Sequence, residues 1–199
     1  ERVVELGAGL GALTYYLVQD YPRVTAVERD RELFPIVKNY FEWADNLAWM
    51  EADAAKLDYQ ALCAEPNEEL VVIGNLPYQI SSRILVSLAE AATFVRRSVV
   101  LIQKEVAQRI VAEPGTKAYG LLSVLIQRAY TGHILKIVPP EVFLPPPKVH
   151  SAVIALERKD TLLSARDDAI LVAAARAAFS ARRKTLRNSV AGGLGLKPG

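Results

Sequence analysis

The tetrapeptide Asn75-Leu76-Pro77-Tyr78 holds the residue types that point most directly to chemistry. An exocyclic amine on an aromatic base is a weak nucleophile, because its lone pair is delocalised into the ring. The Asn75 side-chain oxygen and a backbone carbonyl of Leu76 or Pro77 could accept hydrogen bonds from such an amine and orient it. Tyr78 offers a flat face to a base that has left its stack. The motif predicts a site where a base amine is held for reaction.

A glycine-rich turn and two carboxylates precede this motif. Glycines at positions 7, 9 and 11 permit a sharp turn and a close approach of the backbone to a ligand, although the dinucleotide fingerprint has its third glycine one residue later. Glu28 lies 21 residues past Gly7, where a carboxylate can accept hydrogen bonds from both hydroxyls of a ribose. Asp53 could accept one from an adenine amino group. The residues that we expect to bind a cofactor are Gly7, Gly9, Glu28, Asp53 and Asn75.

Short apolar runs come before each of these positions. Five strands are predicted, each followed by a helix, over 3–6, 24–27, 47–50, 70–73 and 99–102. Helices are predicted at 12–18, 32–43, around 84–88 and 104–112. Cys63 is expected on a further helix at the surface. Five strand-plus-helix units predict an α/β fold with a Rossmann-like, mostly parallel sheet that is covered on both faces. All the candidate residues then meet at the carboxyl edge of the sheet, where open α/β folds bind ligands.

The pattern changes towards the end of the chain. Two strands are predicted over 134–138 and 149–156, and their proline-rich connection has no room for a crossover helix, so the last strand should be antiparallel. Beyond Lys159 the pattern becomes helical, over about 167–179 and 183–190. We therefore predict a sheet domain over 1–159 and, over 160–199, the start of a small basic helical domain too short to close a core of its own.

Composition bounds the class of protein. The chain has 199 residues, of which 51% are apolar, and no apolar run approaches the ~20 residues of a membrane-spanning helix. A single cysteine, Cys63, and no charged-then-apolar leader favour a cytoplasmic protein. His133 and His150 lack partners at metal-ligand spacing, so no metal is expected.

The net charge of +2 is unevenly placed, because residues 157–199 hold nine Lys or Arg against four Asp or Glu. Four cations fall there at helical spacing, and a fifth, Lys148, lies in the proline-rich loop. Such a patch is typical of contacts with RNA phosphates, although a solvated helix face is an equal alternative. The predicted RNA-binding residues are Lys148, Arg182, Arg183, Lys184 and Arg187.

Several motifs in order resemble those of a known family, the ribosomal RNA small-subunit adenine N6-dimethyltransferases of the KsgA type. They are the segments at 4–14, 75–82, 103–109 and 143–153, with 182–188 matching the family's C-terminal domain. The resemblance implies an S-adenosyl-L-methionine-dependent enzyme that dimethylates two adjacent adenines of small-subunit ribosomal RNA during ribosome maturation. It further implies that Phe143 stacks on the target base, that Asn75 to Tyr78 bind it, and that the partner is the immature small subunit.

Two features and three alternatives qualify that expectation. The family's N-terminal Gln-Asn-Phe-Leu motif and the remainder of its C-terminal domain are absent from this sequence. The protein is expected to be a monomer.

Three other functions are considered. They are a large-subunit ribosomal RNA methyltransferase that confers antibiotic resistance, a non-catalytic nucleic-acid-binding relative and an NAD-linked oxidoreductase. An intact Asn75-Leu76-Pro77-Tyr78 argues against lost catalysis.

Overall fold

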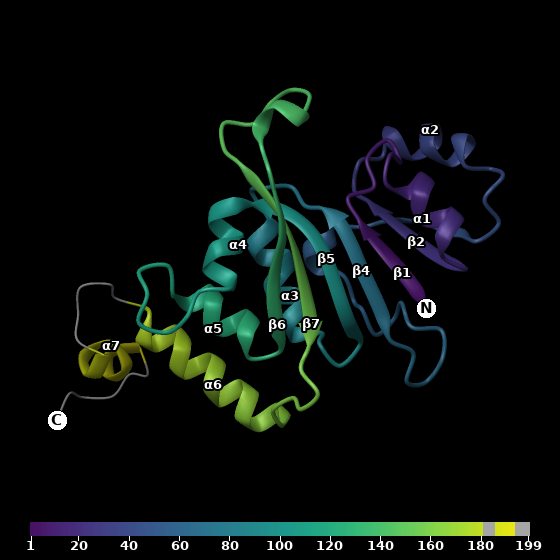
Figure 1. Ribbon diagram of the computed structural model, residues 1–199. Helices are drawn as coiled ribbons and strands as arrows, with labels where there is room; N and C mark the ends of the chain where they lie inside the picture. Colours follow the sequence, from purple (N-terminus) through teal and green to yellow (C-terminus); the bar gives the residue numbers. More distant parts are fainter. Residues whose placement is uncertain (181–185, 194–199) are drawn as a thin grey trace.

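The computed structural model describes residues 1–180 and 186–193 and contains one sheet of seven strands (Figure 1). The strand order is β3-β2-β1-β4-β5-β7-β6. β7 runs opposite to the other six strands, because β1 to β5 pair in parallel and β7 is antiparallel to both β5 and β6. The predicted Rossmann-like sheet with a late antiparallel strand is confirmed. The strands are β1 (Arg2–Leu6), β2 (Arg23–Glu28), β3 (Leu47–Glu51), β4 (Leu70–Asn75), β5 (Val95–Gln103), β6 (Tyr130–Val138) and β7 (Ser151–Arg158).

Seven helices accompany the strands in the described part of the chain, and none of them is long and apolar enough to cross a membrane. The core consists of two clusters of buried side chains, one on each face of the sheet, and alternate residues of β4 belong to different clusters. Val72 packs in the cluster that includes residues of the third to fifth helices. Val71 packs in the cluster that includes Leu17 and Phe41, from the first two helical regions. The helices are α1 (Thr14–Asp20), α2 (Leu33–Tyr40), α3 (Ser81–Glu90), α4 (Lys104–Ile110), α5 (Leu121–Gln127), α6 (Ala165–Ala178) and α7 (Leu186–Gly193).

The prediction that helices cover both faces of the sheet is only partly right. On the face that α1 and α2 cover, Ile73, Val99, Leu101 and Val153 of the central strands are only half-buried. The opposite face is closed, since Val72, Val100 and Ile102 are at most 1% exposed. The two helices α1 and α2 follow β1 and β2, so they extend over that end of the sheet and leave the middle strands partly open.

The third strand is not followed by an α-helix, which corrects the prediction of five strand-plus-helix units. A 3-10 turn, Ala54–Lys56, and irregular turns connect β3 to β4. Asp53 and Asp58 each accept backbone N–H groups two or three residues on, which starts a new turn at each aspartate instead of a continuous helix. Cys63 therefore lies in a turn rather than on a surface helix, and its thiol donates to the Tyr59 and Glu68 carbonyls.

The segment before β6 contains α5, over which the sequence pattern predicts no element. Its run Leu121-Leu122-Ser123-Val124-Leu125-Ile126 is almost wholly apolar, so periodicity could not separate a buried strand from a buried helix. The Ser123 hydroxyl caps the first turn of the helix by accepting the Gly120 N–H at 3.0 Å. The strands β5 and β6 also begin four residues earlier than predicted, at Val95 and Tyr130.

The β6–β7 connection, residues 139–150, projects beyond the sheet at the top of Figure 1. It carries a short 3-10 turn, Pro140–Val142. Both strand ends that bound it lie at the carboxyl edge of the parallel strands, because Ser151 pairs with Gln103 at the end of β5 and with Val138 at the end of β6. The loop therefore overhangs the same edge as the candidate site.

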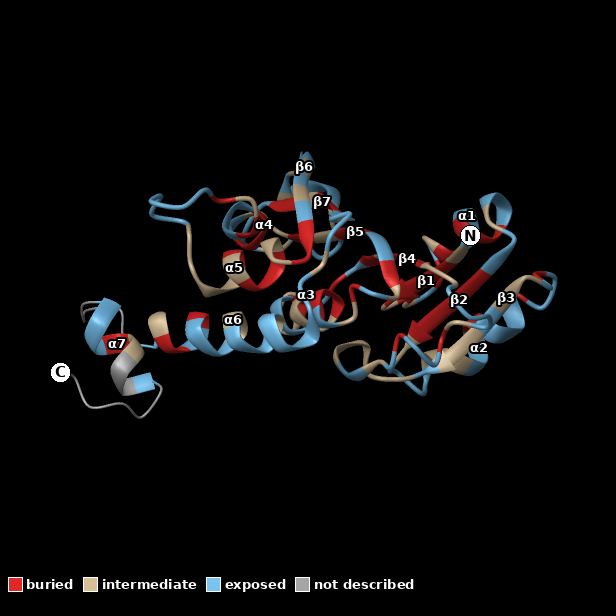
Figure 2. Ribbon diagram, turned by 90° about the horizontal axis from the view of Figure 1, so that it is seen from below, coloured by how far each residue is buried: buried red, intermediate tan, exposed pale blue. Residues whose placement is uncertain are grey.

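The helices α6 and α7 lie beyond the sheet on the side away from β1 to β3 (Figure 2). An ion pair ties α6 to the sheet domain: Arg128 Nε lies 2.7 Å from Asp168 Oδ1, and the Arg128 side chain is 3% exposed. Most of α6 is exposed or half-buried. The predicted boundary at residue 159 stays a prediction, although the chain does turn here from the last strand to a helical segment.

Candidate active site

A cavity of about 530 Å³ opens at the carboxyl edge of the sheet, within the size range of small-molecule sites. The ends of β1, β2 and β4 and the turn after β3 form its wall. Four of the five predicted cofactor residues line this cavity, and only Gly9 does not. The lining residues used below are Gly7, Glu28, Asp53, Asn75, Pro77 and Ile80.

The glycine turn brings the backbone to the cavity wall. Gly7 has φ +73°, a left-handed conformation that favours glycine, and its N–H donates to the Val27 carbonyl at 2.9 Å. A Cβ on Gly7 would lie 3.5 Å from the Asn75 carbonyl oxygen. Gly9 serves the site indirectly, since its N–H donates to Glu28 Oε2 at 2.8 Å.

The Glu28 carboxylate is held in place by three backbone N–H groups. Oε1 accepts from Arg29 at 2.7 Å and from Asp30 at 2.9 Å, while Gly9 is the one donor to Oε2 among the described residues, at 2.8 Å. A carboxylate offers about four acceptor positions, so Oε2 retains capacity for a ligand hydroxyl. Contact with both hydroxyls of a ribose requires one of these backbone bonds to give way. The position fits the predicted role, but the occupied acceptors could not be foreseen from spacing.

Asp53 caps a turn with one carboxylate oxygen and lines the cavity. Its Oδ1 accepts the Ala55 N–H at 3.0 Å and so caps the 3-10 turn. Its Oδ2 has no hydrogen-bond partner among the described residues, and the side chain lines the cavity. Apolar neighbours Val27, Ala52 and Ile80 share this wall. An adenine ring could therefore pack on apolar groups while its amino group donates to Asp53.

The Asn75 motif presents two acceptors without partners in the described structure. The Asn75 side chain is exposed at the end of β4 and makes no hydrogen bond. The Pro77 carbonyl accepts the Ile80 N–H at 3.1 Å, whereas the Leu76 carbonyl accepts none. Of the two carbonyls left open by the sequence, that of Leu76 is the available one. The Leu76 side chain is a core residue, 1% exposed, and anchors the motif.

Tyr78 is fixed at both ends. The Ser81 hydroxyl donates to the Tyr78 carbonyl at 3.1 Å, and the Tyr78 hydroxyl lies 2.5 Å from Ser151 Oγ on β7. No role for the hydroxyl follows from the sequence, and Ser151 was not among the predicted site residues. The two residues are 73 positions apart, so no local signal could have found the pair.

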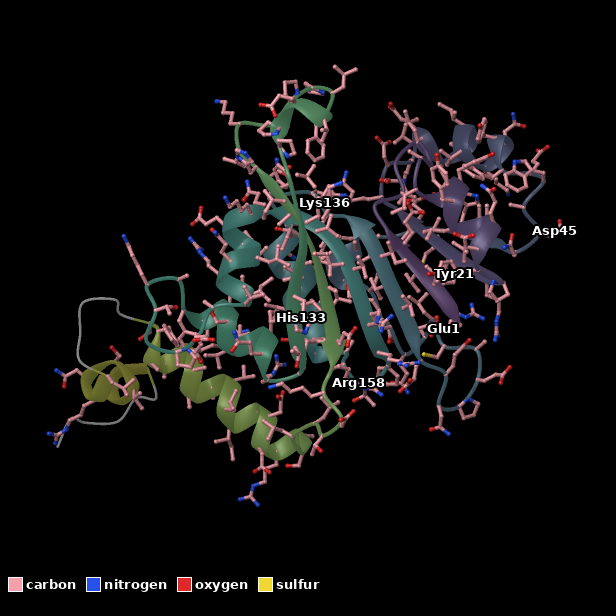
Figure 3. The ribbon with its side chains drawn as sticks, viewed as in Figure 1. Glu1, Tyr21, Asp45, His133, Lys136 and Arg158 are labelled. Carbon is pink, nitrogen blue, oxygen red and sulfur yellow. The ribbon has the colours of Figure 1, made fainter. Side chains whose placement is uncertain are left out.

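Phe143 and Lys148 lie in the projecting loop rather than in the cavity. Phe143 is half-buried and Lys148 is exposed, and neither lines the cavity. Figure 3 labels Lys136 of β6 near the base of this loop, with His133 further along the strand and Arg158 towards the opposite edge of the sheet. The structure brings the loop to the correct edge, but stacking of Phe143 on a base stays a prediction.

Glu5 is a second residue that sequence reasoning missed. It lies directly below the glycine turn, is 2% exposed, and its Oε2 accepts the Thr14 hydroxyl at 2.5 Å. Burial raises the pKa of the Glu5 carboxyl, the bonds from Thr14 oppose this shift, and the nearby Glu28 charge adds to it. A buried carboxyl group, that of Glu5, therefore lies two residues before the first glycine of the turn.

The predicted RNA-binding residues are not gathered at the cavity. Arg182, Arg183 and Lys184 lie outside the described residues. Arg187 is exposed on α7, which Figure 1 shows well away from the β6–β7 loop. Their assignment to RNA phosphates stays a prediction.

No other described cluster competes as a catalytic centre. Among the described residues, no group of three or more His, Cys, Asp or Glu could hold a metal ion. Burial raises the pKa of the Cys63 thiol, and the Glu68 carboxylate adds to this effect, so the thiolate is disfavoured. A larger cavity of about 770 Å³ lies at the opposite edge of the sheet, where Arg158 pairs with Glu69.

The sheet order and the cavity at its carboxyl edge define a Rossmann-like methyltransferase. The acceptors Glu28 and Asp53 and the apolar wall suit a ribose and an adenine, so the residues present fit S-adenosyl-L-methionine. The family profile described as "Ribosomal RNA adenine dimethylase" matches residues 1–194. The chain belongs to this family of S-adenosylmethionine-dependent enzymes that act on ribosomal RNA, as the resemblance implied.

Named relatives agree with this placement. "Ribosomal RNA small subunit methyltransferase A" of Anaeromyxobacter dehalogenans is 43% identical over 198 residues, which cover 96% of this chain and 69% of that protein. The protein of the same name from Thiobacillus denitrificans is 40% identical, over 100% of this chain and 80% of its own length. A dimethyladenosine transferase from Plasmodium falciparum is 30% identical with a TM-score of 0.77, covering 94% of this chain and 66% of that one. The 23S rRNA methyltransferase ErmE, at 24% identity and a TM-score of 0.75, shares the fold.

Proposed function

We propose that the protein dimethylates the N6 amino groups of two adjacent adenines in small-subunit ribosomal RNA, on an immature subunit. The carrying observation is the pair of unoccupied acceptors, the Asn75 side-chain oxygen and the Leu76 carbonyl, beside a cavity that fits S-adenosylmethionine. The small-subunit substrate is supported by the names of the relatives at 40–43% identity. On this proposal the protein acts as a monomer in the cytoplasm, where its substrate matures.

The chain's own residues would act mainly by orientation. In the first transfer, the Asn75 oxygen and the Leu76 carbonyl accept hydrogen bonds from the two N–H groups of the target amine, which turns its lone pair towards the cavity; in the second transfer, the singly methylated amine has one N–H left for one of these acceptors. Both acceptors also stabilise the positive charge that develops on the nitrogen during transfer. Bound S-adenosylmethionine would supply the electrophilic methyl group. Glu28 and Asp53 would hold the ribose and adenine ends of that ligand, and Tyr78 would stack on the target base.

The alternatives are less well supported. The large-subunit enzyme ErmE shares the fold at lower identity than the small-subunit relatives. A non-catalytic nucleic-acid-binding role would leave the two unoccupied acceptors of the Asn75 motif without a purpose. An NAD-linked oxidoreductase is disfavoured by the family match over residues 1–194.

The test is single-turnover methyl transfer to small subunits from an unmodified strain, with saturating cofactor and full-length protein. Asn75→Ala should lower the maximal rate at least ~100-fold, because it removes an interaction that strengthens in the transition state. Asn39→Ala, which removes an exposed amide on α2, is the matched control. A fully active Asn75→Ala protein would refute the orientation mechanism, and an unmutated protein that methylates only large-subunit RNA would refute the substrate.

A further inference from the structure

The contact between Tyr78 and Ser151 joins two parts of the molecule that the proposed function uses separately. Tyr78 belongs to the motif between β4 and α3, whereas Ser151 is the first residue of β7. Their hydroxyl oxygens are 2.5 Å apart, and either can donate. Ser151 is 0% exposed, so this hydroxyl is not a surface group that happens to meet a neighbour.

Ser151 itself has little freedom to move. It pairs with Gln103 of β5 on one side and with Val138 of β6 on the other. The preceding residue is tied as well, because the His150 carbonyl accepts the Lys104 N–H at 3.0 Å. A rigid strand end therefore presents one hydroxyl to the Tyr78 ring.

The ring of Tyr78 is constrained at the opposite end by its own backbone. The Ser81 hydroxyl donates to the Tyr78 carbonyl, and Ser81 is 0% exposed at the first turn of α3. With the backbone held by Ser81 and the phenol oxygen held by Ser151, the first side-chain torsion of Tyr78 and the position of its ring are fixed; the phenol oxygen lies on the Cβ–Cγ axis, so the contact does not stop the ring from turning about that axis. The ring therefore keeps one position relative to Asn75, three residues earlier.

We propose that Ser151 is a positioning residue for the target base: its hydroxyl holds the Tyr78 ring at the place where the adenine stacks. This inference rests on the proposed function. It also links the base site to the loop that carries Phe143, since Ser151 directly follows that loop. Stacking contributes to both the ground state and the transition state, so the effect of Ser151 should fall on RNA capture rather than on the maximal rate.

The test is a double-mutant cycle in the full-length protein, with single-turnover methyl transfer measured over a range of small-subunit concentrations at saturating S-adenosylmethionine. Ser151→Ala should raise the half-saturating subunit concentration about two- to tenfold, the loss expected for one hydrogen bond. The maximal rate should change less than about twofold. Tyr78→Phe should give the same increase, and the double variant should be no worse than either single variant.

Controls separate positioning from general damage to the fold. Ser98→Ala removes another fully buried serine hydroxyl, on β5, that has no hydrogen-bond partner among the described residues, and it should leave both kinetic parameters unchanged. Ser151→Thr keeps the hydroxyl and should restore RNA capture. S-adenosylmethionine affinity should be unaltered in Ser151→Ala.

The outcomes are distinguishable. If the unmutated protein transfers no methyl group to small subunits, the proposed function fails, and this inference falls with it. If the unmutated protein is active and Ser151→Ala matches it, only the positioning role is overturned. A double variant whose loss equals the product of the two single losses would show that Ser151 acts independently of the Tyr78 hydroxyl, which also overturns it.

Discussion

At the scale of single residues, Glu28 both holds the glycine turn and faces the cavity. We expect Glu28→Ala to lower S-adenosylmethionine affinity at least about tenfold, because hydrogen bonds to a charged group contribute ~1.5–3 kcal/mol each. Calorimetric titration measures this directly. Glu51→Ala is the matched control, since Glu51 pairs with Glu28 in register on β3 but does not line the cavity. Equal affinity in the Glu28→Ala and unmutated proteins would exclude Glu28 from the cofactor site.

Glu5 makes a separate prediction about stability and pH. Because burial raises the pKa of Glu5 above its ordinary value of 4.5, ionising this carboxyl costs more in the folded than in the unfolded protein. The penalty is absent below about pH 4.5 and grows as pH rises through the folded-state pKa. Glu5→Gln keeps an acceptor for Thr14 without the charge. It should therefore gain free energy of unfolding, relative to the unmutated protein, as pH rises.

Urea unfolding of both proteins between pH ~4 and pH ~8 measures the difference. The two unfolding free energies should converge at the acid end. If Glu5→Gln instead loses stability towards neutral pH, the ionised Glu5 carboxylate stabilises the fold, and the raised pKa is wrong.

At the scale of elements, the basic run before and within α7 is the predicted RNA contact. Replacing Arg182, Arg183, Lys184 and Arg187 with alanine should weaken RNA binding and flatten its salt dependence by roughly 0.7–0.9 log unit of slope per lost phosphate contact. Binding measured at several salt concentrations gives this slope. Arg96 and Arg97 are exposed cations at the start of β5, at the edge of the sheet opposite to the candidate site. Their replacement with alanine is the control. An unchanged slope in the quadruple variant would identify a solvated helix face.

At the scale of the whole molecule, the Arg128–Asp168 ion pair joins α6 to the sheet domain. Asp168→Ala should lower the free energy of unfolding by about 2–3 kcal/mol, because it leaves the Arg128 guanidinium, 3% exposed, without its counter-charge. Urea unfolding measures the loss. The neighbouring Asp167→Ala removes only an exposed contact with the Ser164 cap at the start of α6 and should cost less, about 1 kcal/mol. Equal losses would mean that α6 is not anchored through Arg128.

Much of the site was predictable because its parts are local. Each of the first four predicted strands is a short apolar run followed within three residues by a candidate residue, so Gly7, Glu28, Asp53 and Asn75 were expected at one edge of a parallel sheet. The structure places all four around one cavity. Their chemical roles stay predictions, as do those of Phe143 and the basic run.

The sequence by itself determined most of the alternation of strands and helices along the chain, the antiparallel last strand and the family, because local periodicity and ordered motifs carry that information. Only the tertiary structure decided which carbonyl of the Asn75 motif is unoccupied, that Glu28 already binds three backbone N–H groups, and that Tyr78 meets Ser151. For the contact between Tyr78 and Ser151, the physical reason is the insertion of β7 between β5 and β6, which brings residues 73 positions apart into contact. No local pattern encodes such a pairing, since it depends on the register of strands that are distant in the chain.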